Sequence, residues 1–110
     1  MTFNDRTTPL SLLATRRSGK PRDLVAPGPD AVQLDTMLAI AARTPDHGKL
    51  APWRFVVIDD RDAFADLLHT AAKDDPDAPD RAALDQFARQ APTLVAVLST
   101  PVRDSRIPVW

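Results

Sequence analysis

The chain has 110 residues, of which 44% are apolar and 26% are charged, with a formal net charge of −1 and no cysteine. This composition fits one small globular domain, which we expect to span residues 1–110. The near-neutral charge argues against a general nucleic-acid binder, and no apolar run approaches the ~20 residues needed to cross a bilayer. The lack of cysteine excludes disulfides, thiolate metal sites and a cysteine nucleophile. Because the N-terminus lacks a signal-peptide pattern, a cytoplasmic location is the default expectation.

The charges are unevenly distributed along the chain. Residues 1–58 hold eight Lys/Arg and five Asp, a net charge of +3, whereas residues 59–110 hold six Lys/Arg and ten Asp, a net charge of −4. A basic first half suits a small phosphorylated ligand, although three charges also fall within ordinary surface variation. Every acid is an aspartate, a residue that favours helix caps and turns over helix interiors.

The first half predicts two helices joined by an extended segment. A helix over residues 10–17 ends at two arginines and Ser18-Gly19. The proline-rich residues 19–30 predict an extended connection, in which Leu24 and Val25 would anchor onto the core. Asp30 would cap a second helix over residues 31–43. Its inward stripe would comprise Leu34, Met37, Leu38 and Ala41.

The second half predicts two strands and two further helices. Residues 55–58 are apolar on both alternating sets, so both faces of this strand should be covered. Asp59 or Asp60 would cap a helix over residues 61–72, followed by an acidic loop at 73–80, a helix at 81–90 and a strand at 93–98. Residues 100–110 predict an irregular tail. The inward residues of the two helices would be Phe64, Leu67, Leu68, Ala71, Leu84, Phe87 and Ala88. This order indicates a layered arrangement around a central sheet.

Arg16, Arg17 and Ser18 form the first candidate site. Two guanidinium groups and a hydroxyl can bind a phosphate, because arginine matches phosphate oxygens and serine adds a neutral donor. The simpler interpretation, which the tripeptide alone favours, is that cations at a helix C-terminus complement the helix dipole. Lys20 and Arg22, further along the extended segment, modestly favour the phosphate interpretation.

His47 and Lys49 form the second candidate site, in the loop before the first strand. Both side chains suit a ligand with phosphate or carbonyl oxygens. They do not predict a metal site, because the sequence has only one other histidine, His69. That residue falls near the solvent side of a helix, where we expect an ordinary surface residue. Ser18 and Ser99 lack the glycines of a nucleophile elbow, and no dinucleotide-binding or P-loop motif occurs. Pro52-Trp53 alone indicates no more than an aromatic at the start of a strand.

Taken in order, these segments resemble the front half of the nitroreductase family of flavin enzymes, in its small single-domain branch. The segments that carry the resemblance are Arg16-Arg17-Ser18 with Arg22, Thr44-Pro45-Asp46-His47, Pro52-Trp53 before an apolar strand, and Ile107-Pro108-x-Trp110. The resemblance implies an α+β, three-layer α-β-α fold, here truncated after the second strand. It also implies FMN as cofactor and NAD(P)H as hydride donor. Nitroaromatic compounds, quinones or similar small molecules would be the acceptors, in a two-step exchange through the flavin N5.

The resemblance assigns roles to individual residues. Arg16, Arg17 and Ser18, with Arg22 nearby, would hold the FMN phosphate and ribityl chain. His47 would hydrogen-bond the flavin, and Lys49 would neutralise the cofactor or NAD(P)H. At Ala51 the family usually has an amide residue that contacts the isoalloxazine, so this contact should be missing or supplied otherwise. No catalytic side chain and no metal ligand are expected, since the flavin carries the chemistry.

The resemblance also bears on partners, because the family continues beyond Ile-Pro-x-Trp with a central helix and further strands that complete the flavin pocket and the dimer. We therefore expect a homodimer, or association through an uncovered sheet face. Neither a nucleic acid nor a membrane is expected as a partner. Two alternatives remain. One is a non-catalytic flavin- or phosphate-ligand-binding or interaction domain on the same scaffold. The other is an unrelated small α/β domain whose residues 16–22 bind another phosphorylated ligand.

Overall fold

The computed structural model of the protein describes residues 2–45 and 52–100. In chain order the elements are α1 (Pro9–Thr15), the 3-10 helix η1 (Pro21–Asp23), α2 (Ala31–Ala41), β1 (Trp53–Val57), α3 (Arg61–Ala72), α4 (Arg81–Arg89) and β2 (Val95–Ser99). The predicted helices and strands are present in the predicted order, with ends within two residues of expectation. Helices combined with an antiparallel sheet confirm the α+β class.

Each α-helix begins at a polar side chain that accepts a hydrogen bond from the first turn: Thr8 before α1, Asp30 before α2, Asp60 before α3 and Asp80 before α4. The predicted cap Asp30 forms a capping box with Gln33, with N–O distances of 2.8 and 2.9 Å. Of the two candidates before α3, Asp60 makes the contact, accepting from the Ala63 N–H at 3.0 Å. A cap of this kind stabilises a helix by about 1 kcal/mol, which explains why the starts could be predicted locally.

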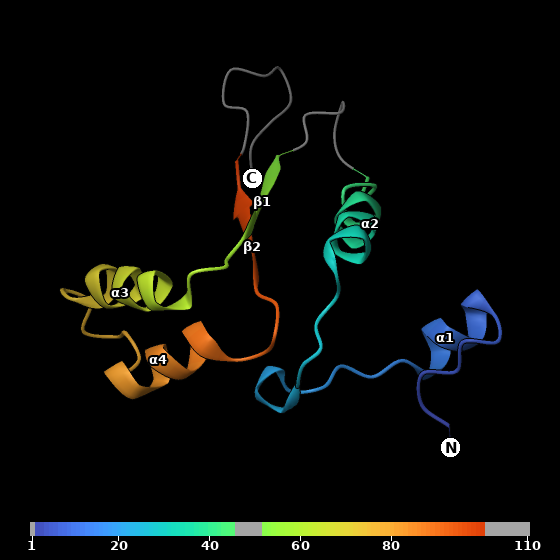
Figure 1. Cartoon of the computed structure of the whole chain (residues 1–110), viewed down its shortest axis with the longest axis horizontal. Helices are drawn as coiled ribbons and strands as arrows, with labels where there is room; N and C mark the ends of the chain where they lie inside the picture. Colours follow the sequence, from blue (N-terminus) through green and yellow to red (C-terminus); the bar gives the residue numbers. More distant parts are fainter. Residues whose placement is uncertain (1, 46–51, 101–110) are drawn as a thin grey trace.

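The two strands pair antiparallel at the centre of the molecule (Figure 1), with Trp53 opposite Ser99 and Val57 opposite Val95. Hydrogen bonds extend the ladder by one step at each end. The Ile58 N–H donates to the Leu94 carbonyl at 2.9 Å, and the Thr100 N–H donates to the Pro52 carbonyl at 2.7 Å. In the same view α2 lies to one side of the sheet, and the α3–α4 pair lies on the other side beyond the end of β1.

The prediction that both faces of the first strand are covered is wrong for the described part of the chain. Phe55 and its partner Val97 share one face, and Val97 is 67% exposed. On the other face Val56 is 43% exposed and Leu98 is 46% exposed. The helices flank a sheet of only two strands and leave apolar side chains accessible on both of its faces.

Helices α3 and α4 pack closely because small residues meet between them. Ala65 and Ala88 are 1% and 0% exposed. Beside them the rings of Phe64 and Phe87 lie 6.4 Å apart between centroids, at an interplanar angle of 45°. A tilted aromatic pair at this distance adds to the burial energy of the two rings.

Arg61, the first residue of α3, holds this helix pair to the strands. Its Nε donates to the Ile58 carbonyl at 3.1 Å, and its Nη1 donates to the carbonyls of Ala88 and Gln90 at 3.1 and 3.0 Å. Its Nη2 donates to the Ala91 carbonyl at 3.1 Å, and Ala91 has a positive φ of 62°. A single guanidinium therefore satisfies three carbonyls where α4 ends and the chain turns towards β2. No feature of the sequence alone indicated this role.

The extended segment is anchored through its backbone. Leu24 and Val25 do not anchor it as predicted, because their exposed fractions are 55% and 80%. Contact is made instead at Gly28, where an added Cβ would lie 2.6 Å from Thr93 Oγ1. Residues 24–29, α2 and the start of β2 enclose an apolar cavity of about 410 Å³ beside this contact.

The chain as a whole is open. Its accessible surface is 9213 Å², whereas a compact monomer of 12.0 kDa exposes about 6,000 Å². Its radius of gyration is 17.5 Å, compared with about 13 Å for a compact domain of ~100 residues. Several residues predicted to face inward are exposed, among them Met37 at 56%, Leu67 at 67% and Phe87 at 49%. Their helical periodicity is real, but the surfaces that would cover them are absent from the described residues.

Candidate functional site

Arg16, Arg17 and Ser18 follow the end of α1 directly. Helix α1 stops at Thr15, because Arg16 turns to an extended backbone with φ −63° and ψ 146°. The last turn of α1 contains no basic residue. The dipole interpretation stays open, because Arg16 is the C-cap residue of α1 and lies directly at its C-terminal end.

The structure brings Arg16 and Ser18 together and turns Arg17 elsewhere. Arg16 Nη1 lies 3.5 Å from Ser18 Oγ, a long hydrogen bond between two exposed side chains. The guanidinium of Arg17 lies over the ring of Phe3, 4.4 Å from its centroid, and the Arg17 N–H donates to Asn4 Oδ1 at 3.1 Å. Arg16 and Ser18 thus form a donor pair, while a cation–π contact of about 0.5–1 kcal/mol holds Arg17 against the N-terminal residues.

Arg22 lies with Lys20 on a different surface. Arg22 belongs to η1 and Lys20 directly precedes it, and both line a cavity of about 410 Å³, whose other wall is α4 and the residue after it. The α4 wall is formed by Ala83, Gln86, Phe87 and Gln90. Sequence reasoning missed the two glutamines. Their spacing could have indicated them, because positions 83, 86, 87 and 90 follow the i, i+3, i+4, i+7 pattern of residues that share one face of a helix.

The other three predicted site residues, His47, Lys49 and Ala51, lie outside the described residues. Their assigned roles stay predictions. Trp53, at the start of β1 after this segment, is half-buried.

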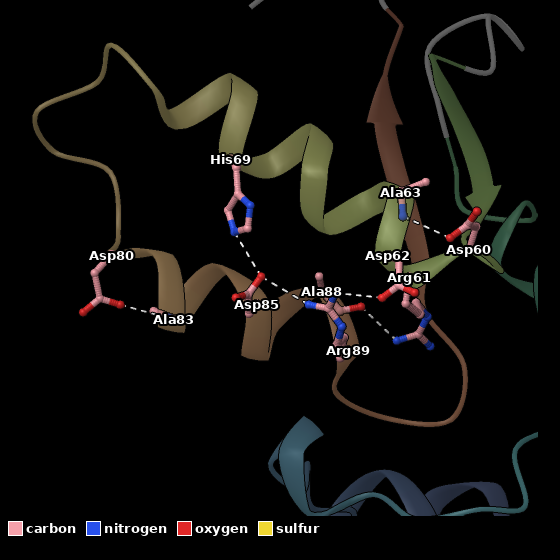
Figure 2. Close-up of polar contacts among 10 residues, drawn as sticks. All are labelled: Asp60, Arg61, Asp62, Ala63, His69, Asp80, Ala83, Asp85, Ala88 and Arg89. Carbon is pink, nitrogen blue, oxygen red and sulfur yellow. Dashed lines mark hydrogen bonds and ion pairs between the residues drawn. The ribbon is translucent and has the colours of Figure 1, made fainter.

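The prediction for His69 is wrong. The His69 side chain is only 16% exposed, and its Nε2 lies 3.0 Å from Asp85 Oδ1, although the contact is not directed as a hydrogen bond. Figure 2 shows how the contacts continue: Arg89 donates to Asp85 Oδ1 at 3.2 Å and to Asp62 Oδ1 at 2.7 Å. The Asp62 carboxylate holds the pKa of Arg89 above its usual range, with Asp85 adding to the effect and desolvation opposing it. His69 faces α4 because that helix packs across α3, which the periodicity of α3 alone does not reveal.

Within residues 2–45 and 52–100, the structure contains no group of three or more His, Cys, Asp or Glu side chains that could hold a metal ion. In this same part of the chain, no helix is long and apolar enough to cross a membrane. The candidate site is therefore built from arginines, a lysine, a hydroxyl and carboxamides, which are groups suited to anionic ligands.

The model of the nitroreductase family matches residues 13–108. The chain belongs to the nitroreductase family. The match includes the Arg16–Ser18 pair, the cavity between η1 and α4, and both strands. The α+β fold of nitroreductase type expected from the resemblance is confirmed.

Two curated relatives agree with this assignment. The chain is 34% identical over 106 residues to "Putative NAD(P)H nitroreductase YdjA" of Escherichia coli K12, a match that covers 92% of this chain and 56% of that protein. It is 50% identical over 50 residues to "Putative NAD(P)H nitroreductase" of Haemophilus influenzae, covering 46% of this chain and 26% of that protein. The chain thus spans about half the length of YdjA.

Proposed function

We propose that this chain forms part of an FMN-dependent oxidoreductase that transfers hydride from NAD(P)H to a nitroaromatic compound, a quinone or a similar small acceptor. The supporting observation is the Arg16–Ser18 donor pair, exposed at the end of α1 in a chain of the nitroreductase family. Both relatives carry NAD(P)H nitroreductase in their names, which supports an oxidoreductase. A cytoplasmic location stays a prediction.

The residues at the end of α1 fit the phosphate of FMN. The Arg16 guanidinium can form paired hydrogen bonds to phosphate oxygens, and the Ser18 hydroxyl adds a donor beside it. Neither side chain has an acidic partner among the described residues. Bound FMN would supply the hydride chemistry, and the protein would bind and orient it. Arg17 and Arg22 would add positive charge. His47 would hydrogen-bond the flavin, Lys49 would neutralise the cofactor or NAD(P)H, and the contact to the isoalloxazine would be missing at Ala51.

FMN titration tests this assignment, with quenching of flavin fluorescence as the readout. We expect Arg16→Ala to weaken FMN binding about tenfold, because a charge-assisted contact contributes ~1.5–3 kcal/mol. Arg17→Ala should weaken it less, since the Arg17 guanidinium is engaged with Phe3. Arg43→Ala, which removes an exposed arginine at the end of α2, is the matched control. Equal affinities for all three variants, or no binding by the unaltered chain, would contradict the proposal.

Turnover separates this function from its main alternative. NAD(P)H oxidation with a nitroaromatic or quinone acceptor should exceed the rate with free FMN. FMN binding without such turnover would favour the non-catalytic flavin- or phosphate-ligand-binding domain. Binding of another phosphate ligand through Arg16 and Arg17, with no affinity for FMN, would favour the unrelated α/β domain.

We further propose that a second copy of the chain covers the exposed sheet. The excess surface of about 3,000 Å² per chain is more than the ~1,000–2,500 Å² that each subunit of a stable homodimer buries, so one chain has enough uncovered surface for such an interface. Val97→Lys would place a charge on the exposed face of β2 and should shift the molecular mass measured by light scattering towards the monomer. Thr70→Lys, on the exposed side of α3, serves as the control. A monomeric unaltered chain, or an unchanged mass for Val97→Lys, would contradict this interface.

A further inference from the structure

Residues 3–5 contact the end of α1 and form what we call the N-terminal clasp. The Asn4 N–H donates to the Thr15 carbonyl at 3.0 Å, and the Asp5 N–H donates to Thr15 Oγ1 at 2.9 Å. In return, the Arg17 N–H donates to Asn4 Oδ1 at 3.1 Å. Thr15 is the last residue of α1, where carbonyls lack partners within the helix, so the clasp supplies one from the chain before the helix.

Asn4 takes an uncommon backbone conformation where it makes these contacts. Its φ of 56° lies in the left-handed region, which asparagine and glycine adopt more readily than other residues. From this position its N–H bonds the last residue of α1, and its side chain bonds the residue two positions further on. A non-glycine residue persists in this region where surrounding contacts fix it, and such residues cluster at functional sites.

The clasp acts on residues that burial does not hold, because Arg16, Arg17 and Ser18 are all exposed. The last hydrogen bond of α1 joins the Arg16 N–H to the Leu12 carbonyl at 2.8 Å, and the Asn4 contact then fixes the next amide, that of Arg17. This amide lies in the chain between the two residues of the donor pair, Arg16 and Ser18. Holding it therefore limits how far the two donor side chains can separate.

Phe3 holds the side chain of Arg17 without using its donors. The guanidinium lies over the Phe3 ring, 4.4 Å from its centroid, in a cation–π contact that needs no hydrogen bond. Within the described residues the Arg17 side chain forms no hydrogen bond and no ion pair, so its N–H groups are open to a ligand. Phe3 is itself 47% exposed, so the contact orients Arg17 at the surface without burying it.

We propose that the N-terminal clasp orders the FMN phosphate site at the end of α1, with Asn4 and Phe3 as positioning residues. The inference rests on the proposed function, because it names residues that prepare the phosphate site of that reaction. Asn4 fixes the backbone between Arg16 and Ser18, and Phe3 fixes the side chain of Arg17. A site that is ordered before binding loses less conformational freedom when the ligand arrives and therefore binds it more tightly.

Amide hydrogen exchange measured by NMR tests the clasp without a ligand. Asn4→Gly keeps the left-handed backbone and removes the Oδ1 acceptor, so the Arg17 amide should exchange about five times faster. Thr2→Gly, which places a glycine at the exposed position just before the clasp, is the matched control. It should leave the exchange of the Arg17 amide unchanged.

FMN titration, with quenching of flavin fluorescence as the readout, tests the positioning role. Asn4→Gly should weaken FMN binding about three- to fivefold, and Thr2→Gly should leave it unchanged. In a chain that also carries Arg16→Ala and Ser18→Ala, Asn4→Gly should change the affinity by less than about twofold, because the pair that it positions is gone. A general loss of folding would instead lower the affinity by the same factor in both backgrounds.

Two variants of Phe3 separate the cation–π contact from packing. Phe3→Leu keeps an apolar side chain but removes the aromatic face, so FMN binding should weaken about twofold. Phe3→Trp keeps an aromatic face for Arg17 and should bind FMN as the unaltered chain does. Equal affinities of the two variants would overturn the positioning role of Phe3.

Inorganic phosphate separates the failure of the clasp from the failure of the flavin proposal. The inference is overturned if Asn4→Gly matches Thr2→Gly in exchange or in affinity, or if its effect persists unchanged without the donor pair. A chain that binds inorganic phosphate, seen as shifts of the Arg16 and Ser18 amides, but not FMN refutes the flavin proposal. The clasp then stands if Asn4→Gly weakens phosphate binding and falls if it does not. A chain that binds neither ligand overturns both proposals.

Discussion

In the α3–α4 hairpin, residues Arg61–Arg89, two alanines are buried between the helices, whereas none of residues 2–45 is buried. The hairpin packs through contacts between neighbouring elements of the chain. In the N-terminal half, Leu13, Val32 and Ile40 are 71%, 75% and 65% exposed, so much of the apolar surface of α1 and α2 is uncovered in the described structure. The two helices of the hairpin bury residues against each other, whereas the N-terminal half would need further surfaces to cover its apolar side chains.

This difference is relevant to function because the candidate ligand groups lie in the less buried half or at its contact with the hairpin. The Arg16–Ser18 pair follows α1, and the cavity joins η1 to α4. Ligand-binding segments are commonly drawn from the less stable parts of a fold. We therefore expect variants in the hairpin to change stability, and variants around residues 16–22 to change binding.

The largest loss of stability is expected for Arg61→Ala. This change removes donors from the carbonyls of Ala88, Gln90 and Ala91 at the end of α4, so we expect a cost of about 2–4 kcal/mol. Urea unfolding followed by circular dichroism measures the effect. The exposed Arg81, at the start of α4, provides the control Arg81→Ala. Its free energy of unfolding should stay within about 0.5 kcal/mol of that of the unaltered chain. Equal midpoints for the two variants would show that Arg61 does not hold the hairpin.

A second effect of about 1–3 kcal/mol is expected for Gly28→Ala, because the new methyl group would lie 2.6 Å from Thr93 Oγ1 and force the extended segment away from β2. Gly19→Ala is the matched control, since nothing lies within 4 Å of a Cβ at that position. It should be neutral, or stabilising by up to ~1 kcal/mol through the unfolded state. If both substitutions had the same effect in urea, the contact between residue 28 and β2 would not anchor this half.

A smaller effect is expected where polar side chains join α3 to α4. Asp85→Asn removes the charge that His69 and Arg89 share, and we expect a loss of about 0.5–1 kcal/mol because these groups are partly exposed to solvent. The loss should shrink in high salt. Asp66→Asn, an exposed carboxylate elsewhere on α3, should show neither the loss nor the salt dependence. An Asp85→Asn cost that persists unchanged in high salt would indicate packing rather than charge.

The sequence predicted what depends on local chemistry. Asp30 could be predicted as a cap, and Asp60 as one of two candidates, because a cap contacts backbone only three residues away. The ends of α1 and α4 lie within two residues of expectation, since Ser18-Gly19 and Ala91-Pro92 follow them. The chemistry of the side chains made Arg16 and Ser18 part of a candidate phosphate site, and the structure brings these two side chains into contact.

What the sequence did not predict depends on residues far apart in the chain. Arg61 contacts carbonyls 27 to 30 residues away, and nothing near it indicates those partners. His69 was placed on the solvent side because α3 was considered alone, whereas its partner Asp85 lies on another helix. The apolar residues of α2 and α3 do recur with helical spacing, yet this spacing does not show whether another surface covers them.

The smallest effect concerns the N-terminal residues that fold back on α1. The Thr7 N–H and then the Thr7 hydroxyl donate to Asp5 Oδ1 at 3.0 and 2.8 Å and lower the pKa of this carboxyl below its ordinary value. Because the folded-state pKa is the lower one, the contribution is complete above about pH 4, the ordinary range of an aspartate, and is lost as the pH falls through the folded value. The Thr7 amide resonance should therefore titrate at acid pH in the unaltered chain and lose this titration in Asp5→Asn. Asp35→Asn, on the exposed side of α2, should keep it. If the Thr7 titration survived in Asp5→Asn, another group would cause it, and the residues before α1 would be held by other contacts, such as those of the Asn4 and Asp5 N–H groups with Thr15 at 3.0 and 2.9 Å.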